Sequence, residues 1–448
     1  MSDTTQHARV EGENSSGEAM YQLACELFPF HRGITGPGVR ASLKVLQQHV
    51  PLQVHEVPSG TSVYDWEVPK EWRVGSAYIA DAEGNHVVDI ADSNLHIIGY
   101  SDAIDATVAW SELRTHLVTL PKHRGWIPYR SSHFESGWGF CLTHRQFEEL
   151  EARGEVDYRV VIDSELIDGA LTYGEIYLPG ASKDEVLIST HVCHPSLAND
   201  NLSGIVVATW IAKQFASTSN RYSYRFIFVP ATIGAITWLA LNAKGLPSIR
   251  HGLVLTGVGD SGSITYKRSR RDCAEIDRAT AHVLAHSAYP YEIRKFEPFG
   301  YDERQYCSPG IDLQMGCLMR SPNGEYPEYH TSADNLDFLR PDALAGSLET
   351  AVEILSVLEA NTSYVNQNPM CEPQLGRRGL YRSFGNLNDG GAAQRAVQWV
   401  LSYSDGHHSL LDIAERANLP FDQVRHATDV LIEQQLLLDV NVDVGATE

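Results

Sequence analysis

The residues best suited to chemistry lie in the stretch STHVCHPSLANDNLSG, residues 189–204. His191 ends an apolar run that is typical of a buried strand, and Asp200 follows nine residues later in a polar loop. Parallel sheets place functional groups at the carboxyl ends of their strands. A neutral imidazole and a carboxylate at one sheet edge suit Zn²⁺. We therefore predict a zinc site here; the alternative is a capped helix start beside a surface histidine.

Neighbouring polar residues could support or complete this site. Asn199 and Asn201 flank Asp200 and could orient its carboxylate through hydrogen bonds. His194 could act as a further ligand, or could simply pack beside the following proline. Cys193 could also approach a zinc ion, although a single cysteine in such a run is more typical of buried packing.

Two later segments add donors of the same kind. YDERQYCSPGID, residues 301–312, puts Asp302 in a polar loop, and EYHTSADN, residues 328–335, puts His330 before a helix-entry pattern. A lone histidine such as His330 is more often structural than a ligand. The order histidine, aspartate, acidic residue, histidine along one chain is what favours a shared metal site.

Strands and helices that alternate along the chain must position these donors. Apolar runs at 186–191, 224–230 and 251–259 predict strands, and helical spacing at 203–215, 234–243 and 274–287 predicts helices between and after them. Strict alternation predicts an α/β fold with a mostly parallel sheet flanked by helices. The expected domains are a discontinuous α/β domain (18–55 plus 176–362), an inserted β-rich module (56–175) and a C-terminal winged-helix module (385–448).

Composition narrows the class of protein. The chain has 448 residues with a formal net charge of −22, which disfavours nucleic acid and anionic membranes as partners. No apolar run reaches the ~18 residues that a membrane span needs. The polar start lacks the apolar segment of a secretory signal, and the seven cysteines are scattered without a CxxC pair. We therefore expect a cytoplasmic protein.

The predicted winged helix has the wrong charge for DNA. From Gly391 onward the chain has three arginines, no lysine and nine acidic residues. Nucleic-acid binding requires the opposite sign. We expect this module to contact protein, with a homo-oligomer as one outcome.

Several segments together resemble a known family. STHVCHPSLANDNLSG, YDERQYC and YHTSADN are similar to the metal-binding segments of the M28 zinc aminopeptidases. HRGITGPGVRASL, VYDWEVPKEW, GWGFCLTH and YKRSRRD resemble a bacterial aminopeptidase-like subgroup with an inserted β-module and a C-terminal winged helix. This resemblance implies a zinc exopeptidase-like fold. It also implies that His191, Asp200 and Asp302 hold one zinc ion, with Asp200 as the bridge to a second site containing His330 and a glutamate.

The chain departs from that family where a glutamate pair is expected. Ala231 stands at the position of the general base, and Thr232 at that of the second-site ligand. Alanine cannot accept a proton, and a threonine hydroxyl is a poor zinc ligand. The departure predicts one zinc ion per chain rather than two, and a base from elsewhere. Glu303 is the candidate base, although it could equally face solvent.

Substrate contacts are predicted mainly in the basic run YKRSRR, residues 266–271. Arg268, Arg270 and Arg271 could bind a carboxylate or phosphate, or could belong to an exposed, solvated hairpin. Arg32 and Arg40 are weaker candidates for the same role. The aromatic residues of the insert, Trp126, Tyr129 and Trp138, could line a cleft or form the core of the insert.

These observations favour a zinc-dependent hydrolase of the aminopeptidase type that cleaves an amide bond of a small-molecule or peptide-like, aminoacyl substrate. Two alternatives stay open. One is a one-zinc acyl transferase or cyclase in a biosynthetic pathway, in which a substrate amine replaces water. The other is a non-catalytic scaffold with an aminopeptidase fold, which the lost glutamate pair favours and the four retained ligands oppose.

Overall fold

The protein is described by a computed structural model that covers residues 2–132, 135–380 and 391–440. Its backbone contacts separate two compact units. The first comprises Met1–Asp272 and Pro290–Glu349, and the second comprises Cys273–Tyr289 and Thr350–Glu448. No helix in the described part of the chain has the length and apolar character needed to cross a bilayer.

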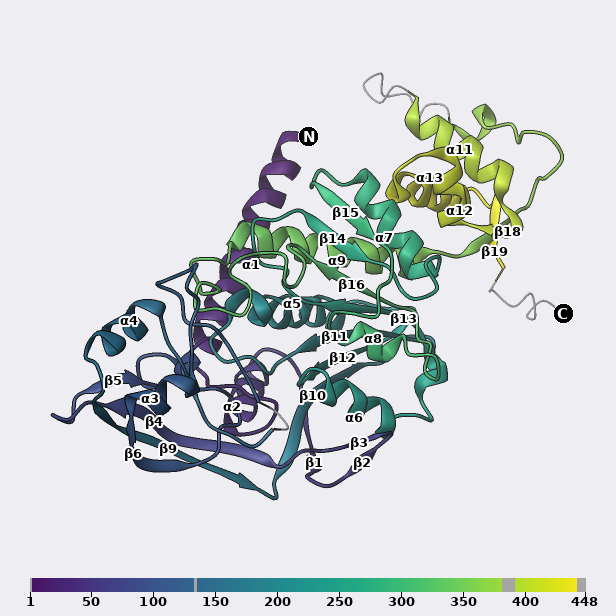
Figure 1. Ribbon diagram of the computed structural model, residues 1–448. Helices are drawn as coiled ribbons and strands as arrows, with labels where there is room; N and C mark the ends of the chain where they lie inside the picture. Colours follow the sequence, from purple (N-terminus) through teal and green to yellow (C-terminus); the bar gives the residue numbers. More distant parts are fainter. Residues whose placement is uncertain (1, 133–134, 381–390, 441–448) are drawn as a thin grey trace. The chain divides into compact units, whose positions relative to one another are not determined.

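A central sheet of eight strands organises the first unit (Figure 1). Its order is β1 (Gln53–Pro58), β10 (Ala170–Leu178), β12 (Ser223–Val229), β11 (Glu185–His191), β13 (Ile249–Leu255), β16 (Met315–Met319), β14 (Ile264–Lys267) and β15 (Tyr291–Arg294). Strands β12, β11, β13 and β16 run parallel to one another, as β14 and β15 do; the remaining neighbours are antiparallel. The predicted α/β fold with a mostly parallel sheet is therefore confirmed.

Helices cover both faces of this sheet. They are α1 (Ser2–Leu27), α2 (Pro37–Leu46), α5 (Gly204–Ala216), α6 (Ile233–Leu241), α8 (Glu303–Tyr306) and the start of α9 (Pro341–Ala360). Successive side chains of β11 point to opposite faces. Ser189 Oγ lies 2.8 Å from the hydroxyl of Tyr306 in α8, whereas Thr190 meets the start of α5. A Cβ added to Gly204 would lie 2.6 Å from Thr190 Oγ1, so this close approach requires glycine.

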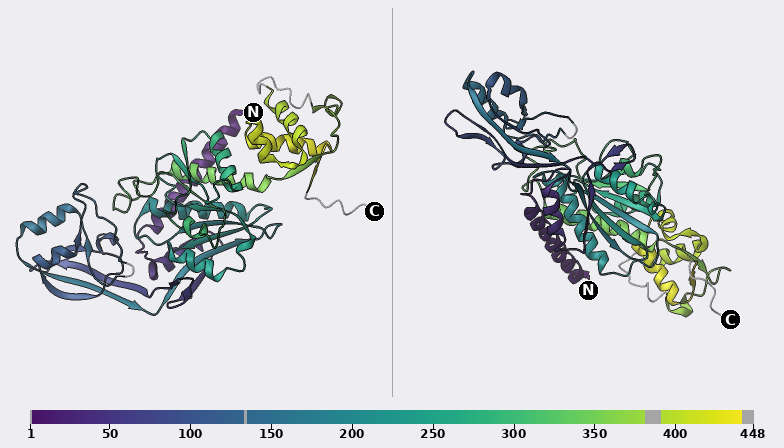
Figure 2. Two further views of the ribbon diagram at one scale, coloured as in Figure 1. Left: turned by 45° about the vertical axis from the view of Figure 1, so that its right-hand side comes forward. Right: turned by 90° about the horizontal axis from the view of Figure 1, so that it is seen from below.

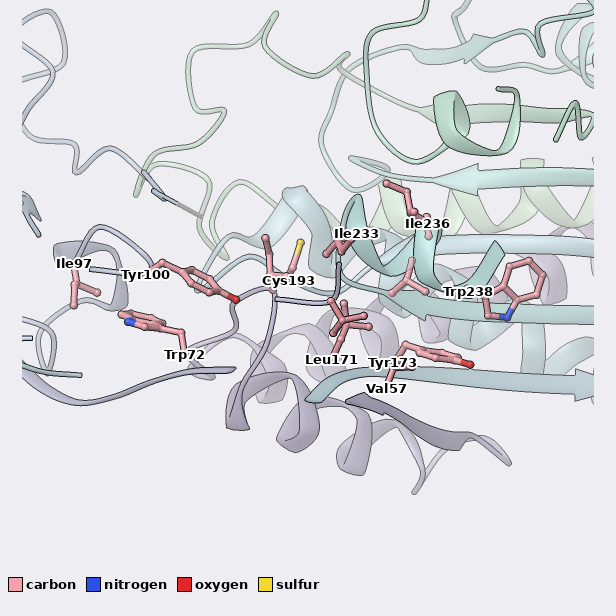
Figure 3. Packing of buried hydrophobic residues seen from close by; sticks show 14 of the residues in the cluster. Val57, Trp72, Ile97, Tyr100, Leu171, Tyr173, Cys193, Ile233, Ile236 and Trp238 are labelled. Carbon is pink, nitrogen blue, oxygen red and sulfur yellow. The ribbon is translucent and has the colours of Figure 1, made fainter. Parts of the chain in front are cut away.

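A large apolar core fills the space between the sheet and α6 and continues into the insert. Figure 3 shows part of it, with Leu171 and Tyr173 of β10 close to Ile233, Ile236 and Trp238 of α6. The Trp238 indole donates its N–H to Glu175 Oε2 at 2.9 Å, so its polar atom is satisfied. This packing fixes the strands at whose ends the candidate site lies.

The insert forms a separate antiparallel sheet of order β5-β4-β9-β6 (Figure 2). The strands are β4 (Glu71–Ala80), β5 (His86–Asp89), β6 (Ile104–Ala109) and β9 (Asp157–Ile167), with helices α3 (Trp110–Leu113) and α4 (His144–Ala152). Short strand pairs β2 (Ser62–Val63) with β3 (Trp66–Glu67), and β7 (Leu117–Val118) with β8 (Phe140–Cys141), complete it. Strand β10, expected within the insert up to residue 175, instead belongs to the central sheet. The insert leaves that sheet at Pro58 and returns at its paired neighbour Ala170.

The second unit contains a small helical module. Helices α11 (Ala392–Tyr403), α12 (Leu410–Ala417) and α13 (Phe421–Glu433) accompany a sheet of β18 (Asp405–Ser409), β17 (Ser363–Asn366) and β19 (Leu437–Asp439). Ser409 and Asp412 form a capping box that starts α12. Helix α7 (Glu275–His286) belongs to the same unit, where Arg278 contacts Asp412 and Glu415, each at 2.6 Å.

Candidate metal centre

The candidate site lies at the carboxyl end of β11, as its sequence predicts. His191 is the last residue of that strand, and Asp200 lies in the turn Ala198–Ser203 that leads into α5. Both side chains are buried. His191 Nε2 lies 2.8 Å from Asp200 Oδ1, within hydrogen-bond distance. The alternative of a surface histidine beside a simple helix cap is therefore excluded.

Three imidazoles converge on the carboxylate of Asp200. Besides His191, His330 Nε2 lies 2.9 Å from Oδ2, and His194 Nε2 lies 3.9 Å from the same oxygen. Burial alone would raise the pKa of Asp200, but the field of His194 and the contacts of His191 and His330 outweigh it and hold the pKa well below its usual range. The carboxylate of Asp200 is therefore charged, and it faces the imidazole nitrogens of three histidines.

The donor set fits a metal ion. One ligand atom from each of His191, His194 and Asp200 lies within 4.8 Å of the others. Asp200 Oδ2 and His330 Nε2 are buried, yet neither has a hydrogen-bond partner with good geometry. Buried polar atoms without partners are rare and costly. Imidazole nitrogens with one carboxylate are a donor set that suits Zn²⁺, and a cation would satisfy both unpartnered atoms.

Asp302 lies beside this group rather than in contact with it. Its neighbour Tyr301 stacks on His191 with ring centroids 4.6 Å apart. Both carboxyl oxygens of Asp302 are buried without hydrogen-bond partners. Burial is the main reason that the pKa of Asp302 rises to about 7, Glu303 adds to it, and the nearby His191 opposes it. His194 thus enters the group directly, whereas the role of Asp302 as a ligand stays a prediction.

The carboxylate of Asp334 holds the turn that carries Asp200. Its Oδ1 accepts the backbone N–H of Asn199 at 2.6 Å, and its Oδ2 accepts that of Asp200 at 2.9 Å. Burial and the neighbouring Asp200 raise the pKa of Asp334 to about 8. The sequence motif YHTSADN contains this residue, but only the fold shows that it reaches across to the other loop.

The two asparagines that flank Asp200 form hydrogen bonds with neighbouring segments instead of with its carboxylate. Asn199 accepts the N–H of Gly259 at 2.9 Å, and Asn201 donates to Thr190 Oγ1 at 2.8 Å. The predicted contact with the carboxylate of Asp200 is not made. Both amides tie the metal-site turn to the loop after β13 and to β11, and so they position the turn as a whole.

Aromatic side chains enclose the histidines. Tyr129 packs edge-on against His194 and His330, with centroids 5.2 and 5.1 Å apart. Tyr329 stacks on His330 at 4.0 Å. Tyr129 belongs to the insert, and its N–H donates to the carbonyl of His330 at 2.8 Å. Tyr129 also packs on the apolar cluster of Leu95, Ile127, Cys141 and Leu197, so it takes part in the core as one expectation requires, and its role in a substrate cleft stays a prediction.

The insert and the His330 loop are joined by a short ladder. Pro128 pairs with Thr331 in an antiparallel bridge. Next to it, Ser332 donates its N–H to Ile127 O at 2.8 Å and its Oγ accepts the N–H of Ile127 at 2.9 Å. His330 itself has a φ of 55°, a conformation uncommon for a non-glycine residue. The ladder holds it in that conformation.

The predicted base, Glu303, is buried and forms an ion pair with Lys267. The alternative expectation, that Glu303 faces solvent, is wrong, because the short helix α8 turns it into the interior. At the other expected base position, the backbone of Ala231 contacts Cys193: its N–H donates to Sγ at 3.3 Å, and its carbonyl accepts from the thiol at 3.9 Å. Cys193 is itself buried in the apolar core, as the packing interpretation requires. The role of Glu303 as a base stays a prediction.

The predicted substrate-binding arginines contact acidic residues of this chain. Arg270 and Arg271 lie 3.2 and 3.0 Å from the carboxylate of Asp312. Arg268 donates to the carbonyl of Asp272 at 2.6 Å. The expected hairpin is not formed, because β14 pairs with β15 and β16 in the central sheet. Their role in substrate binding stays a prediction.

Known proteins share both the sequence and the fold of this chain. The model of a family described as a domain of unknown function, DUF4910, matches residues 21–361, and a winged helix-turn-helix model matches 362–439. A Clostridium acetobutylicum protein is 46% identical over 428 residues, 96% of this chain and 98% of its own length. It carries the name of a polysaccharide biosynthesis protein with an aminopeptidase-like domain.

Solved structures agree with this relationship. A crystal structure named for a peptidase of Clostridium acetobutylicum has a TM-score of 0.92 at 45% identity, and the match covers 97% of this chain and 99% of that one. A zinc aminopeptidase of Bacillus subtilis has a TM-score of 0.57 at 12% identity, with 77% of this chain and 94% of that one covered. The fold is thus that of the M28-type aminopeptidases, followed by a winged helix.

Proposed function

The chain belongs to the DUF4910 family, and from this premise we propose that it is a zinc-dependent hydrolase of the aminopeptidase type. Its substrate would be a small or aminoacyl molecule with a cleavable amide bond. The observation that carries the proposal is the buried carboxylate of Asp200, which faces three imidazoles and has an oxygen without a hydrogen-bond partner. A scaffold has no need for such a costly arrangement.

The side chains of this proposal have separate tasks. His191, His194, Asp200 and His330 would hold one zinc ion, with Asp302 as a further oxygen donor. A bound zinc ion polarises a carbonyl group and lowers the pKa of water towards ~7. Asp334 keeps Asp200 in position through the two backbone N–H groups it accepts. Tyr129 and Tyr329 shield the histidines, which strengthens electrostatic interactions within the site.

A second reaction is favoured by the residues that replace the glutamate pair. Ala231 and Thr232 supply no carboxylate, and the carboxylate of Glu303 is already in an ion pair with Lys267. A reaction in which a substrate amine attacks needs less help from a protein base than one in which water attacks. The relative named for polysaccharide biosynthesis is consistent with such an acyl transfer or cyclisation. We keep this as the alternative reaction of the same site.

Metal analysis tests the site, and product analysis tests the reaction. Protein purified without chelator should contain about one zinc ion per chain, and Asp200→Ala should contain almost none. Asp337→Ala removes an exposed aspartate three residues beyond Asp334; it is the control and should keep the metal. Full zinc content in Asp200→Ala would refute the ligand assignment. Mass spectrometry of a panel of aminoacyl amides separates hydrolysis, which adds water, from cyclisation, which loses ammonia.

The charge of the C-terminal module supports a protein partner. Its three arginines and nine acidic residues, counted from Gly391, give it a negative charge that DNA would repel. We propose that this winged helix contacts protein, including a second copy of the chain. Sedimentation of the full chain at several concentrations tests the homo-oligomer.

A further inference from the structure

We propose that a groove on the surface of the first unit binds a neutral sugar ring, a hexopyranose. The groove lies between the β2–β3 hairpin, α6, and α8 with the turn that follows it. Among the described residues, none that lines the groove belongs to the candidate metal centre. The inference therefore does not rest on the proposed function, and it can be tested on protein without metal.

The groove is large enough for one sugar ring. Its cavity volume is about 310 Å³, which lies within the range of about 300–1,000 Å³ that is typical of small-molecule sites. Helix α6 contacts both β2 and α8, so the walls of the groove come from elements that pack on one another (Figure 1). Part of the groove is open to solvent, and a ligand can therefore enter it.

The floor of the groove is apolar and firmly packed. Ile236 and Leu239 lie three residues apart on α6, which places them on one face of the helix, and both are buried. Ile311 joins them from the segment after α8. All three pack in or against the large apolar core. The groove therefore has a preformed apolar surface, because close-packed interiors of this kind change shape little.

Two exposed aromatic side chains line the groove from the β2–β3 hairpin. Tyr64 is 58% exposed and Trp66 is 45% exposed, whereas Val63 beside them is buried and anchors the hairpin in the apolar core. Exposed apolar surface next to a cavity is typical of binding sites. A pyranose ring presents a face of C–H groups, and this face can pack on the ring of a tyrosine or tryptophan while the hydroxyl groups point outward.

The backbone of the hairpin supports a binding role for Tyr64. Val63 pairs with Trp66, so Tyr64 and Asp65 form a two-residue turn. Tyr64 has a φ of 57°, a left-handed conformation that favours glycine and asparagine and is costly for a bulky side chain. Costly backbone conformations gather at binding sites. The turn by itself gives no reason for a tyrosine at this position, whereas contact between its ring and a ligand does.

Three polar side chains supply hydrogen-bonding groups of both kinds. Asp65 of the turn, Gln305 of α8 and Ser308 of the segment after α8 all line the groove. Within the part of the chain that the structure describes, none of these side chains forms a hydrogen bond or ion pair with protein. A carboxylate accepts hydrogen bonds, and an amide and a hydroxyl both donate and accept them. This mixture matches the hydroxyl groups of a sugar, each of which also donates and accepts.

The charge of the groove disfavours other classes of ligand. Among the described residues that line it, Asp65 is the one charged residue and none is basic, and the whole chain has a formal net charge of −22. Phosphates, nucleotides and carboxylates would therefore be repelled. A purely apolar ligand would leave polar side chains desolvated without partners. An organic cation would use Asp65 but neither Gln305 nor Ser308, and it is the competing class that the experiment separates.

Ligand-observed NMR titrations of chelator-treated, full-length protein test the proposal. The probes are the methyl β-D-glycosides of glucose, galactose, mannose and N-acetylglucosamine, each titrated alone, with choline chloride as the cationic comparison. At least one glycoside should bind with a Kd on the order of 1 mM. Trp66→Ala should weaken that binding at least about tenfold. Tyr291→Ala removes an aromatic ring of equal exposure, 45%, from β15, and as the matched control it should bind the glycoside like the wild type.

Tyr64→Asn separates a binding role from a structural one. Asparagine tolerates the left-handed conformation, so the Tm of this variant should equal or exceed that of the wild type. Its affinity for the glycoside should nevertheless fall at least about fivefold, because the ring that packs on the sugar is lost. A wild type that binds none of the four glycosides with a Kd below about 50 mM would overturn the proposal. Unchanged glycoside binding in both Trp66→Ala and Tyr64→Asn would overturn it as well.

Asp65→Asn distinguishes a neutral sugar from a cation. The variant loses the charge but keeps an acceptor oxygen, so glycoside binding should fall less than about threefold. Glycoside binding should also be the same in about 50 mM and about 500 mM sodium chloride, because no charge on the ligand is screened. Choline binding that weakens with salt and disappears in Asp65→Asn, with no glycoside bound, would overturn the sugar assignment in favour of an organic cation.

Discussion

Replacing Asp334 tests whether its carboxylate holds the turn Ala198–Ser203, which carries Asp200, in place. In Asp334→Ala the N–H groups of Asn199 and Asp200 lose their acceptors, which now lie at 2.6 and 2.9 Å. A buried donor without a partner costs about 1–3 kcal/mol. The two together predict a loss of about 2–6 kcal/mol in the free energy of unfolding. Asp334→Asn keeps one acceptor oxygen and should lose about half as much.

The same variants should also weaken zinc binding. Removing a group that orients a metal ligand typically costs 10–100-fold in affinity, and Asp334 orients Asp200 through its backbone. Urea unfolding of chelator-treated protein measures the stability term, and competition with a chromophoric chelator measures the zinc affinity. Stability is measured without metal so that the two effects do not mix.

Asp337→Ala is the matched control for both measurements. Asp337 lies three residues further along the same loop, is exposed, and should change stability by no more than about 0.5 kcal/mol. The reasoning would be refuted if Asp334→Ala lost less than about 1 kcal/mol, or if it bound zinc as tightly as Asp337→Ala does.

Two further ion pairs give predictions about stability. Burial would raise the pKa of Glu71, but hydrogen bonds from Arg40 and Arg73 outweigh it and lower the pKa to about 2 from an ordinary 4.5. This depressed pKa adds about 3 kcal/mol of stability that is complete above pH 4.5 and is lost as pH falls towards 2. Glu71→Gln should therefore be less stable than the wild type at pH 7, with a gap that closes at low pH in urea titrations. Lys267→Met leaves Glu303 buried without its cation and should lower the free energy of unfolding by about 3–5 kcal/mol. A double variant that adds Glu303→Gln should recover part of this loss, measured by calorimetry. Equal Tm values for the single and double variants would contradict the prediction.

The sequence predicts the central part of the molecule well because periodicity and motif agree there. The strand that ends at His191 and the helix that follows Asp200 are each buried on a face that their apolar pattern specifies. The order of His191, Asp200 and His330 along the chain resembles that of the family's metal ligands, which predicts that all three lie at one edge of the central sheet. In the fold, His191 and His330 both contact Asp200.

The errors come from residues whose partners are distant in sequence. The run at 266–271 reads as a solvated hairpin because its arginines dominate, yet the strand that ends in it, β14, pairs on both sides within the central sheet. The guanidinium groups of Arg32 and Arg40 are indistinguishable in sequence; only tertiary structure gives Arg40 the carboxylate of Glu71, whereas Arg32 donates to backbone carbonyls. Likewise no local signal shows that Asp334 accepts bonds from a turn 134 residues away.

The attachment of the insert has a consequence for how such a protein could be rebuilt. Its two ends, Pro58 and Ala170, are paired neighbours in adjacent antiparallel strands, so a tight turn could bridge them and leave the hydrogen bonding of the central sheet intact. The ladder from Ile127 to Ser332 would vanish with it, and Tyr129 would no longer cover the histidines. The insert is nevertheless more than an appendage, because its Glu71 neutralises Arg40 of α2 and its apolar residues continue the core of the central sheet. A chimera that swaps this module should therefore lose stability as well as the contacts that hold His330 in place.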